Sequence, residues 1–241
     1  MKTLIAGATG ATGSLLTRSL LEAGQDVKVM VRSTDRLPEA IRNHKNLEII
    51  EAAILDLPNE QLAGHLADCQ AVASCLGHNL TMKGVFGPPR KLVTDAVRKL
   101  AEAIGQNKVT APVKLVLMNT AGNRNRDLNE PLSFADQLII GLIRLLVPPQ
   151  SDNEQAAEVL RKDVGRNNPA VEWVVIRPDS LIDEEHVTEY TLHASPTQSA
   201  ITNPGKTSRI NVADCMARLI LDNDLWEKWK GQMPVVYNVS T

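Results

Sequence analysis

The sequence has few aromatic residues, no long apolar run and almost no net charge, and each shortage excludes a class of function. Phe, Trp and Tyr make up 3% of the 241 residues, too few for the stacking platforms that bind single-stranded nucleic acid. The most apolar stretch, residues 138–147, is about half as long as a membrane-spanning helix and carries Arg144. A net charge of -2 gives no basis for DNA or an anionic membrane as a partner.

Cysteine and histidine are also scarce, which argues against the frameworks that these residues build. The three cysteines show no CxxC spacing and are odd in number, which indicates a reducing, cytoplasmic setting. The five histidines are scattered without i, i+4 pairing, so we expect no metal site. The chain opens directly on an apolar strand, and we therefore expect no signal peptide.

A short apolar strand at the start of the chain runs into three glycines at a spacing of three. Leucines at helical spacing follow them. In this context Gly7 allows a sharp turn, Gly10 lets the backbone approach a pyrophosphate, and Gly13 lets the helix pack close to the strand. Thr9 and Thr12 add hydroxyl donors, and the free N–H groups of the helix face the phosphates. The motif therefore predicts a dinucleotide-binding loop.

Strands alternate with helices along the whole chain, which predicts an α/β fold with a Rossmann-like, doubly wound parallel sheet. We find no internal repeat or linker, so residues 1–241 are expected to form one NAD(P)-binding domain. The segment 184–205 lacks periodicity and indicates a small excursion on the substrate side. The expected strands lie at 4–6, 26–31, 47–51, 71–75, 113–118, 172–176 and 235–238, with helices between them that include 37–42, 90–107 and 211–222.

An apolar helix is expected from residue 134 to residue 147. Pro148 and Pro149 are expected to stop it, and Asp152 or Asn153 to cap the helix that follows. The stretch 138–147 within the apolar helix is either buried in one chain or shared between two, so the sequence predicts a monomer or a homodimer.

The second strand ends in Arg32 and Ser33, where the adenosine ribose of a dinucleotide arrives. An acidic residue there accepts hydrogen bonds from the ribose hydroxyls of NAD, whereas an arginine neutralises the 2′-phosphate of NADP. The guanidinium fork matches phosphate geometry, Ser33 is a further donor, and Arg36 lies within reach. We therefore expect NADP(H), with NADPH preferred over NADH.

The third and fourth strands end in residues that suit the other parts of a dinucleotide. Asp56 could accept a hydrogen bond from the adenine amino group, although a loop or capping carboxylate explains it almost as well. Gly77 permits close passage of the ribose–phosphate portion. We interpret Cys75 as a small core residue rather than a nucleophile, and His78 as a loop residue rather than a general acid.

These motifs together resemble those of the atypical short-chain dehydrogenase/reductases, and within them the NmrA-like, NAD(P)H-binding proteins that include biliverdin-IXβ/flavin reductases. The resembling segments are residues 7–13, 32–33, 56–57, 177–178 and 208–214. The resemblance implies a nicotinamide near Leu76, Gly77, Thr120 and Pro178, with Thr120 as the candidate catalytic residue. It implies these cofactor-binding residues: Gly7, Ala8, Thr9, Gly10, Ala11, Thr12, Gly13, Arg32, Ser33, Arg36, Asp56, Leu57, Cys75, Leu76, Gly77, Asn119, Thr120 and Pro178.

The chain departs from this family in its acid–base residues. Standard reductases use a Tyr-x-x-x-Lys pair, in which the lysine lowers the pKa of the phenol. Neither Tyr190 nor Tyr237 is followed by Lys at that spacing. Asn119 and Thr120 stand where a catalytic serine is typical, and Asn153 where many relatives place the lysine. An alcohol dehydrogenase mechanism is not expected, and an epimerase is weakened for the same reason.

Two functions of different classes remain. The first is an NADPH-dependent reductase of a small-molecule acceptor that needs little acid–base help, such as a flavin or a quinone, with the proton coming from Thr120 or solvent. The second is a non-catalytic NADP(H) sensor of the NmrA-like type, which would act through a protein partner. An exposed apolar patch on residues 138–147 would favour the sensor, and a closed apolar pocket over the nicotinamide would favour the reductase. We favour the reductase.

Overall fold

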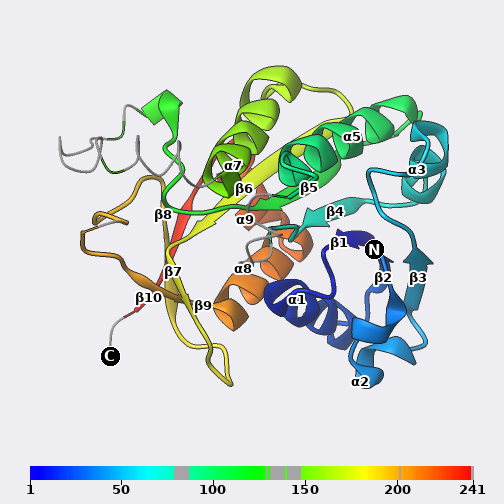
Figure 1. Ribbon diagram of the computed structural model, residues 1–241, viewed down its shortest axis with the longest axis horizontal. Coiled ribbons are helices and arrows are strands. Elements are labelled where there is room, and N and C mark those ends of the chain that lie inside the picture. Colours follow the sequence, from blue (N-terminus) through cyan, green and yellow to red (C-terminus); the bar gives the residue numbers. More distant parts are fainter. Residues whose placement is uncertain (79–86, 129, 131–138, 140–147, 201, 240–241) are drawn as a thin grey trace.

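The structure is a computed structural model, and it describes residues 1–78, 87–128, 130, 139, 148–200 and 202–239. In this part of the chain eight strands form one sheet in the order β3-β2-β1-β4-β5-β6-β10-β8 (Figure 1). All pairs are parallel except β10 with β8. The strands are β1 Lys2–Ala6, β2 Asp26–Val31, β3 Leu47–Glu51, β4 Ala71–Ser74, β5 Val113–Met118, β6 Val171–Pro178, β8 Tyr190–His193 and β10 Val235–Asn238.

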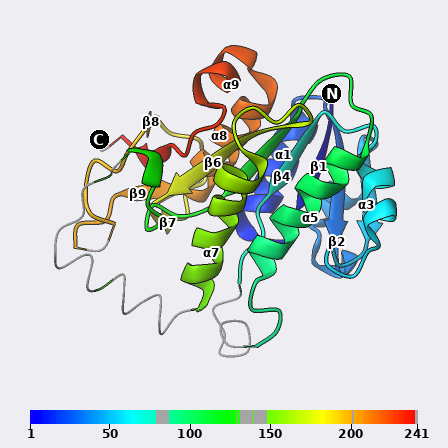
Figure 2. The same cartoon turned by 90° about the horizontal axis from the view of Figure 1, so that it is seen from above.

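Helices cover both faces of this sheet. One face carries α1 (Ala11–Glu22), α2 (Glu39–Arg42), α8 (Arg209–Leu221) and α9 (Asn223–Trp229). The other carries α3 (Asn59–Leu66), α5 (Leu92–Gln106) and α7 (Pro148–Glu158), which continues as a π-helical turn over Val159–Val164. Figure 2 shows α3, α5 and α7 side by side over their face. Of the helices described, none is both long and apolar enough to cross a membrane.

The two faces explain why the central strands are mostly apolar. Along β5, Leu115 and Leu117 belong to the core under α3, α5 and α7, whereas Val116 belongs to the core under α1 and α8. Successive side chains of a strand point to opposite faces, so a sheet covered on both sides needs apolar residues on both faces of its strands. The predicted doubly wound α/β fold is confirmed.

The strand order reverses beside β1. The chain runs from β1 outward to β2 and β3, then crosses back to place β4 on the other side of β1. The loops after β1 and β4 therefore diverge, and they leave a crevice at the carboxyl ends of the strands, where folds of this type bind their ligands. The connection that follows β4 includes residues 79–86, which lie outside the described part.

The predicted strand bounds agree closely with the structure, but two segments differ. The excursion at 184–205 contains β8, the antiparallel partner of β10, and ends just before β9 (Lys206–Ser208), which pairs with β7 (Ser180–Ile182). The predicted cap at Asp152 or Asn153 is wrong, because both residues lie inside α7, whose described part already starts at Pro148. The predicted helix at 134–147 falls outside the described residues, apart from Ile139.

Candidate functional site

The turn between β1 and α1 depends on glycine for packing reasons that the structure makes explicit. Gly7 has φ +87°, and a Cβ there would lie 2.7 Å from the carbonyl of Cys75 on β4's exit. A Cβ on Gly13 would lie 2.2 Å from the carbonyl oxygen of Gly7. These two positions bring α1 against the ends of β1 and β4, and a larger side chain at either would force the backbone apart.

No side chain of the described residues caps the amino end of α1. Gly10 occupies the N-cap position and makes no side-chain capping bond, and the first turn of α1 contains no acidic residue. The N–H groups at a helix start are unsatisfied within the helix, and the helix dipole favours an anion beside them. Such an end suits the pyrophosphate of a dinucleotide.

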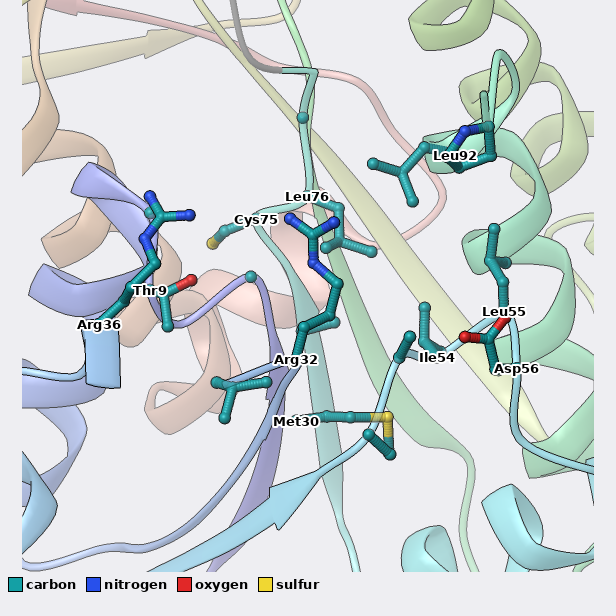
Figure 3. Close-up of a pocket in the computed structure, with 18 of the residues that line it drawn as sticks. Thr9, Met30, Arg32, Arg36, Ile54, Leu55, Asp56, Cys75, Leu76 and Leu92 are labelled. Carbon is teal, nitrogen blue, oxygen red and sulfur yellow. The ribbon is translucent and has the colours of Figure 1, made fainter. Parts of the chain in front are cut away.

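A cavity of about 560 Å³ opens directly in front of this turn (Figure 3). The ends of β1, β2 and β4, the segment after β3 and the start of α5 all contribute to its wall. Its lining residues are Ala6, Gly7, Thr9, Gly10, Met30, Val31, Arg32, Arg36, Ala52, Ala53, Ile54, Leu55, Asp56, Cys75, Leu76, Gly77, Pro88, Pro89 and Leu92. A pocket of this size, mostly apolar with a few polar groups, is typical of a cofactor site.

Two arginines stand at the end of β2 on the rim of this cavity. Arg32 and Arg36 are exposed, and Figure 3 shows both guanidinium groups extending toward the top of the view, Arg36 beside Thr9 and Arg32 beside Leu76. Neither makes a hydrogen bond or ion pair with any residue in the described ranges. Ser33 does not line the cavity: its hydroxyl donates to the Asp35 carboxylate at 3.0 Å and accepts from the Asp35 amide at 3.2 Å. The arginines are thus available to an anionic ligand.

The opposite wall is apolar apart from one carboxylate. Asp56 is exposed at the cavity, across from Arg36 in Figure 3, and its carboxylate has no hydrogen-bond or ion-pair partner among the described residues. Met30 and Ile54 supply the apolar surface between the two sides. Leu57 lies beyond the cavity and packs against the core under α3 and α5.

The end of β4 closes the back of the cavity. Burial raises the pKa of the Cys75 thiol to about 12, so this side chain stays protonated and does not act as a nucleophile at neutral pH. A Cβ added to Gly77 would meet no atom of the described residues within 4 Å. Packing against this part of the chain therefore does not require glycine at position 77, which is consistent with space kept for a ligand.

The end of β5, where the sequence predicts Asn119 and Thr120 beside the nicotinamide, is held by a network of hydrogen bonds. The Asn119 side chain donates to the carbonyl of Asn153 at 2.8 Å and accepts from the Thr120 amide and the Asn123 side chain at 2.9 and 3.3 Å. The Thr120 hydroxyl accepts from the Gly122 amide at 3.2 Å, which leaves its own proton for donation. None of these residues lines the described cavity.

Of the predicted cofactor residues, nine line the cavity: Gly7, Thr9, Gly10, Arg32, Arg36, Asp56, Cys75, Leu76 and Gly77. The others do not. Thr12 and Gly13 are buried in the first turn of α1, and Pro178 ends β6, where its carbonyl accepts from the Ala121 amide at 2.8 Å. The cavity therefore gathers the residues predicted for the adenosine and pyrophosphate. Of the four predicted near the nicotinamide, Leu76 and Gly77 line it, whereas Thr120 and Pro178 do not.

Two buried pairs near the site went unrecognised in the sequence. His78 Nε2 and the Asp152 carboxylate lie 2.7 Å apart, and Asp152 also accepts from the Val93 and Thr94 amides, so it caps α5 and not its own helix. Partners separated by 74 and 58–59 positions leave no local pattern that would reveal them.

The second pair joins Arg177 and Glu130, both buried. Arg177 donates to both carboxylate oxygens of Glu130 at 2.6 and 3.0 Å, and its remaining N–H groups reach the carbonyls of Met233, Asn123 and Ala194. All five N–H donors of the guanidinium are thereby satisfied. This arginine ties together the segments after β5, before β10 and after β8.

Comparison with known proteins identifies the family of the chain. The model of the NAD(P)H-binding family matches residues 7–223, so the chain belongs to that family, and the predicted resemblance is confirmed. Among curated proteins, none matches the sequence.

Solved structures with the same fold share little sequence. A short-chain dehydrogenase/reductase from Veillonella parvula in complex with NADP matches with 16% identity and a TM-score of 0.71, covering 100% of this chain and 95% of its own. A putative NADH-flavin reductase from Streptococcus pneumoniae has 17% identity and a TM-score of 0.66, with 99% and 100% covered. An anaerobilin reductase from Escherichia coli O157:H7 has 13% identity and a TM-score of 0.69, with 100% and 98% covered.

Proposed function

We propose that this NAD(P)H-binding protein is an NADPH-dependent reductase of a flavin-, quinone- or similar carbonyl-type acceptor. The observation that carries the choice of NADPH is the pair of guanidinium groups of Arg32 and Arg36 on the cavity rim, which have no partner among the described residues. A buried or rim arginine without a partner is well suited to a dianionic phosphate, whereas NAD would require an acceptor at the same place.

The residues of the cavity fit the adenosine and pyrophosphate portions of such a cofactor. The amino end of α1 and Gly10 would hold the pyrophosphate, the two arginines the 2′-phosphate, and Asp56 the adenine amino group. Bound NADPH would supply the hydride. The protein's part is then to bind and orient the two reactants and to exclude water from the reacting atoms.

Few side chains among the described residues can donate a proton to the acceptor, and this restricts the kind of acceptor that the protein can reduce. The Tyr190 hydroxyl donates to the Asp214 carboxylate at 2.6 Å, and burial raises the pKa of this phenol well above its usual range. Tyr190 therefore does not serve as an acid. Thr120 is the proposed donor, because its hydroxyl proton is not used by the Gly122 contact. Flavins and quinones suit such a site because they accept hydride with little acid catalysis.

The alternative is a non-catalytic NADP(H) sensor that acts through a protein partner. The hydrogen-bond network at Asn119 favours it, because side-chain groups that would act as catalysts in a reductase are committed to the protein itself. An exposed apolar patch on residues 138–147 would favour the sensor over the reductase, but these residues lie outside the described part except for Ile139.

One experiment separates these proposals. NADPH binding is measured by fluorescence, repeated with NADH, and a panel of flavins and quinones is then added while NADPH oxidation is followed. We expect tight NADPH binding, weaker NADH binding and turnover with at least one acceptor. Tight binding without oxidation would favour the sensor, and equal affinity for both dinucleotides would contradict the role given to Arg32 and Arg36.

A further inference from the structure

The ammonium group of Lys99, on α5, contacts the backbone of the loop that carries Asp56, the residue proposed to bind the adenine. Its Nζ donates to the carbonyl oxygen of Leu55 at 3.0 Å and to that of Leu57. These two carbonyls flank Asp56, which faces the cavity. The ammonium thus reaches the backbone on both sides of a carboxylate, yet it forms no ion pair with that carboxylate.

Lys99 restrains the backbone of this loop, while the Asp56 carboxylate has no hydrogen-bond or ion-pair partner among the described residues. The Asp56 amide donates to the Ala53 carbonyl at 3.0 Å, which closes a turn on the amino side of the loop. Lys99 then fixes the carbonyls before and after Asp56. An ammonium–carboxylate pair would have used the acceptor sites that a ligand needs, because a carboxylate offers only acceptors. The backbone is restrained and the acceptor remains open.

The same helix also builds the apolar wall of the cavity. Leu92, at the start of α5, lines the cavity seven positions before Lys99. Residues seven apart lie on one side of a helix, so a single rigid element sets both the wall and the loop that carries Asp56. Because Val93, Val97, Leu100 and Ile104 anchor α5 in the core, this element has little freedom to move.

We propose that Lys99 is a positioning residue for base recognition: it holds Asp56 where the carboxylate accepts a hydrogen bond from the adenine amino group. The proposal rests on the NADP(H) binding proposed above. The site should therefore prefer a dinucleotide that contains adenine to a dinucleotide in which a carbonyl group replaces the adenine amino group. Lys99 acts through Asp56 and does not itself contact the base.

The test compares NADPH with reduced nicotinamide hypoxanthine dinucleotide phosphate, which lacks the adenine amino group. Because a hydrogen bond to a charged acceptor contributes appreciably to affinity, the wild-type protein should bind NADPH about tenfold more tightly than this analogue. Lys99→Met should weaken NADPH binding about tenfold and leave analogue binding unchanged, so that the preference disappears. Arg98→Met is the matched control, because Arg98 is exposed on the same helix and, within the described part of the chain, pairs with Asp95 alone. It should change neither affinity.

Further variants exclude a merely structural role. Lys99→Arg keeps N–H donors within reach of both carbonyls and should keep most of the preference. Asp56→Asn combined with Lys99→Met should lose no more than either single change, because the two residues act as one unit. Equal weakening of both dinucleotides by Lys99→Met, or identical behaviour of Lys99→Met and Lys99→Arg, would overturn the inference.

The wild-type measurements separate this inference from the proposed function. If the wild-type protein bound both dinucleotides equally well, the base preference would be absent and the inference overturned, while the proposed function would stand. If it bound neither, the proposed function would be wrong, and the inference with it.

Discussion

The strand ends on the two sides of β1 and β4 use their polar groups in opposite ways. At the ends of β2 and β3, Arg32, Arg36 and Asp56 line a cavity and have no partner among the described residues. At the ends of β5 and β6, Asn119 and Arg177 are committed to internal hydrogen bonds. In the proposed function the first region binds the cofactor, whereas the polar groups of the second hold its own loops.

This difference predicts different consequences of mutation. A polar group with an internal partner contributes to the free energy of unfolding, and its loss leaves that partner buried and unpaired. A polar group kept for a ligand contributes to affinity, and its loss should leave folding nearly unchanged. Mutations in the two regions should therefore separate stability from binding.

The largest effect is expected at Arg177. Arg177→Met leaves the Glu130 carboxylate, which is 3% exposed, without its cation, and should lower the free energy of unfolding by about 3–5 kcal/mol. Urea denaturation measures it. Arg126→Met is the control, since Arg126 is exposed and lies 3.7 Å from Glu158; it should cost less than about 0.5 kcal/mol. Similar losses for both variants would contradict the assignment of Arg177 as a structural centre.

Gly13→Ala should affect both stability and binding, because Gly13 joins the two regions. The added Cβ would meet the Gly7 carbonyl oxygen at 2.2 Å, so α1 must shift, which should destabilise the protein by about 3 kcal/mol and weaken NADPH and NADH alike. Thermal unfolding and fluorescence titration measure the two effects. Gly64→Ala in α3 is the control: a Cβ there meets nothing within 4 Å, and the variant should be no less stable than the wild type.

Arg32→Asp should change selectivity without changing stability. The guanidinium is exposed and unpartnered among the described residues, so its loss should leave the free energy of unfolding within about 0.5 kcal/mol of the wild type. NADPH affinity should fall about 100-fold and NADH affinity far less, because only NADPH carries the phosphate that Arg32 would bind. Equal losses for the two dinucleotides would mean that the 2′-phosphate lies elsewhere.

The sequence predicted the residues that line the cavity better than the internally bonded ones, for a physical reason. Gly7, Gly10 and Arg32 line the cavity, and a short local motif contains all of the information that predicts them, whereas an internal hydrogen bond depends on a distant partner. The predicted strands at 26–31, 47–51, 113–118 and 235–238 match β2, β3, β5 and β10 residue for residue, because an apolar run between polar turns defines each of them.

The sequence could not predict hydrogen bonds and strand pairs between residues that lie far apart in the chain. Asp152 has the residue type and spacing of a helix cap, but it caps α5 from within α7, 58–59 positions away. The predicted stop at Pro148 and Pro149 concerns a helix at 134–147 that lies outside the described residues apart from Ile139, and in the described part both prolines belong to α7. β8 was missed because a four-residue edge strand of mixed polarity has no clear period, and its pairing with β10 decides its structure.

The smallest effect is expected at Glu158, a carboxylate away from the cavity that pairs with Arg161. Hydrogen bonds from Arg161 hold the pKa of Glu158 at about 2, below its ordinary value of 4.5. A lowered pKa in the folded state stabilises the protein above pH 4.5, and the contribution disappears as the pH falls towards 2. Because the side chain is 23% exposed, Glu158→Gln should lower the free energy of unfolding by only about 1 kcal/mol at pH 7. Urea denaturation at pH 7 and near pH 2 should show the difference only at the higher pH.

Asp56→Asn is the comparison variant, because the Asp56 carboxylate lines the cavity and has no partner among the described residues. Its free energy of unfolding should stay within about 0.5 kcal/mol of the wild type at pH 7. A loss from Asp56→Asn as large as that from Glu158→Gln would remove the contrast between the two regions.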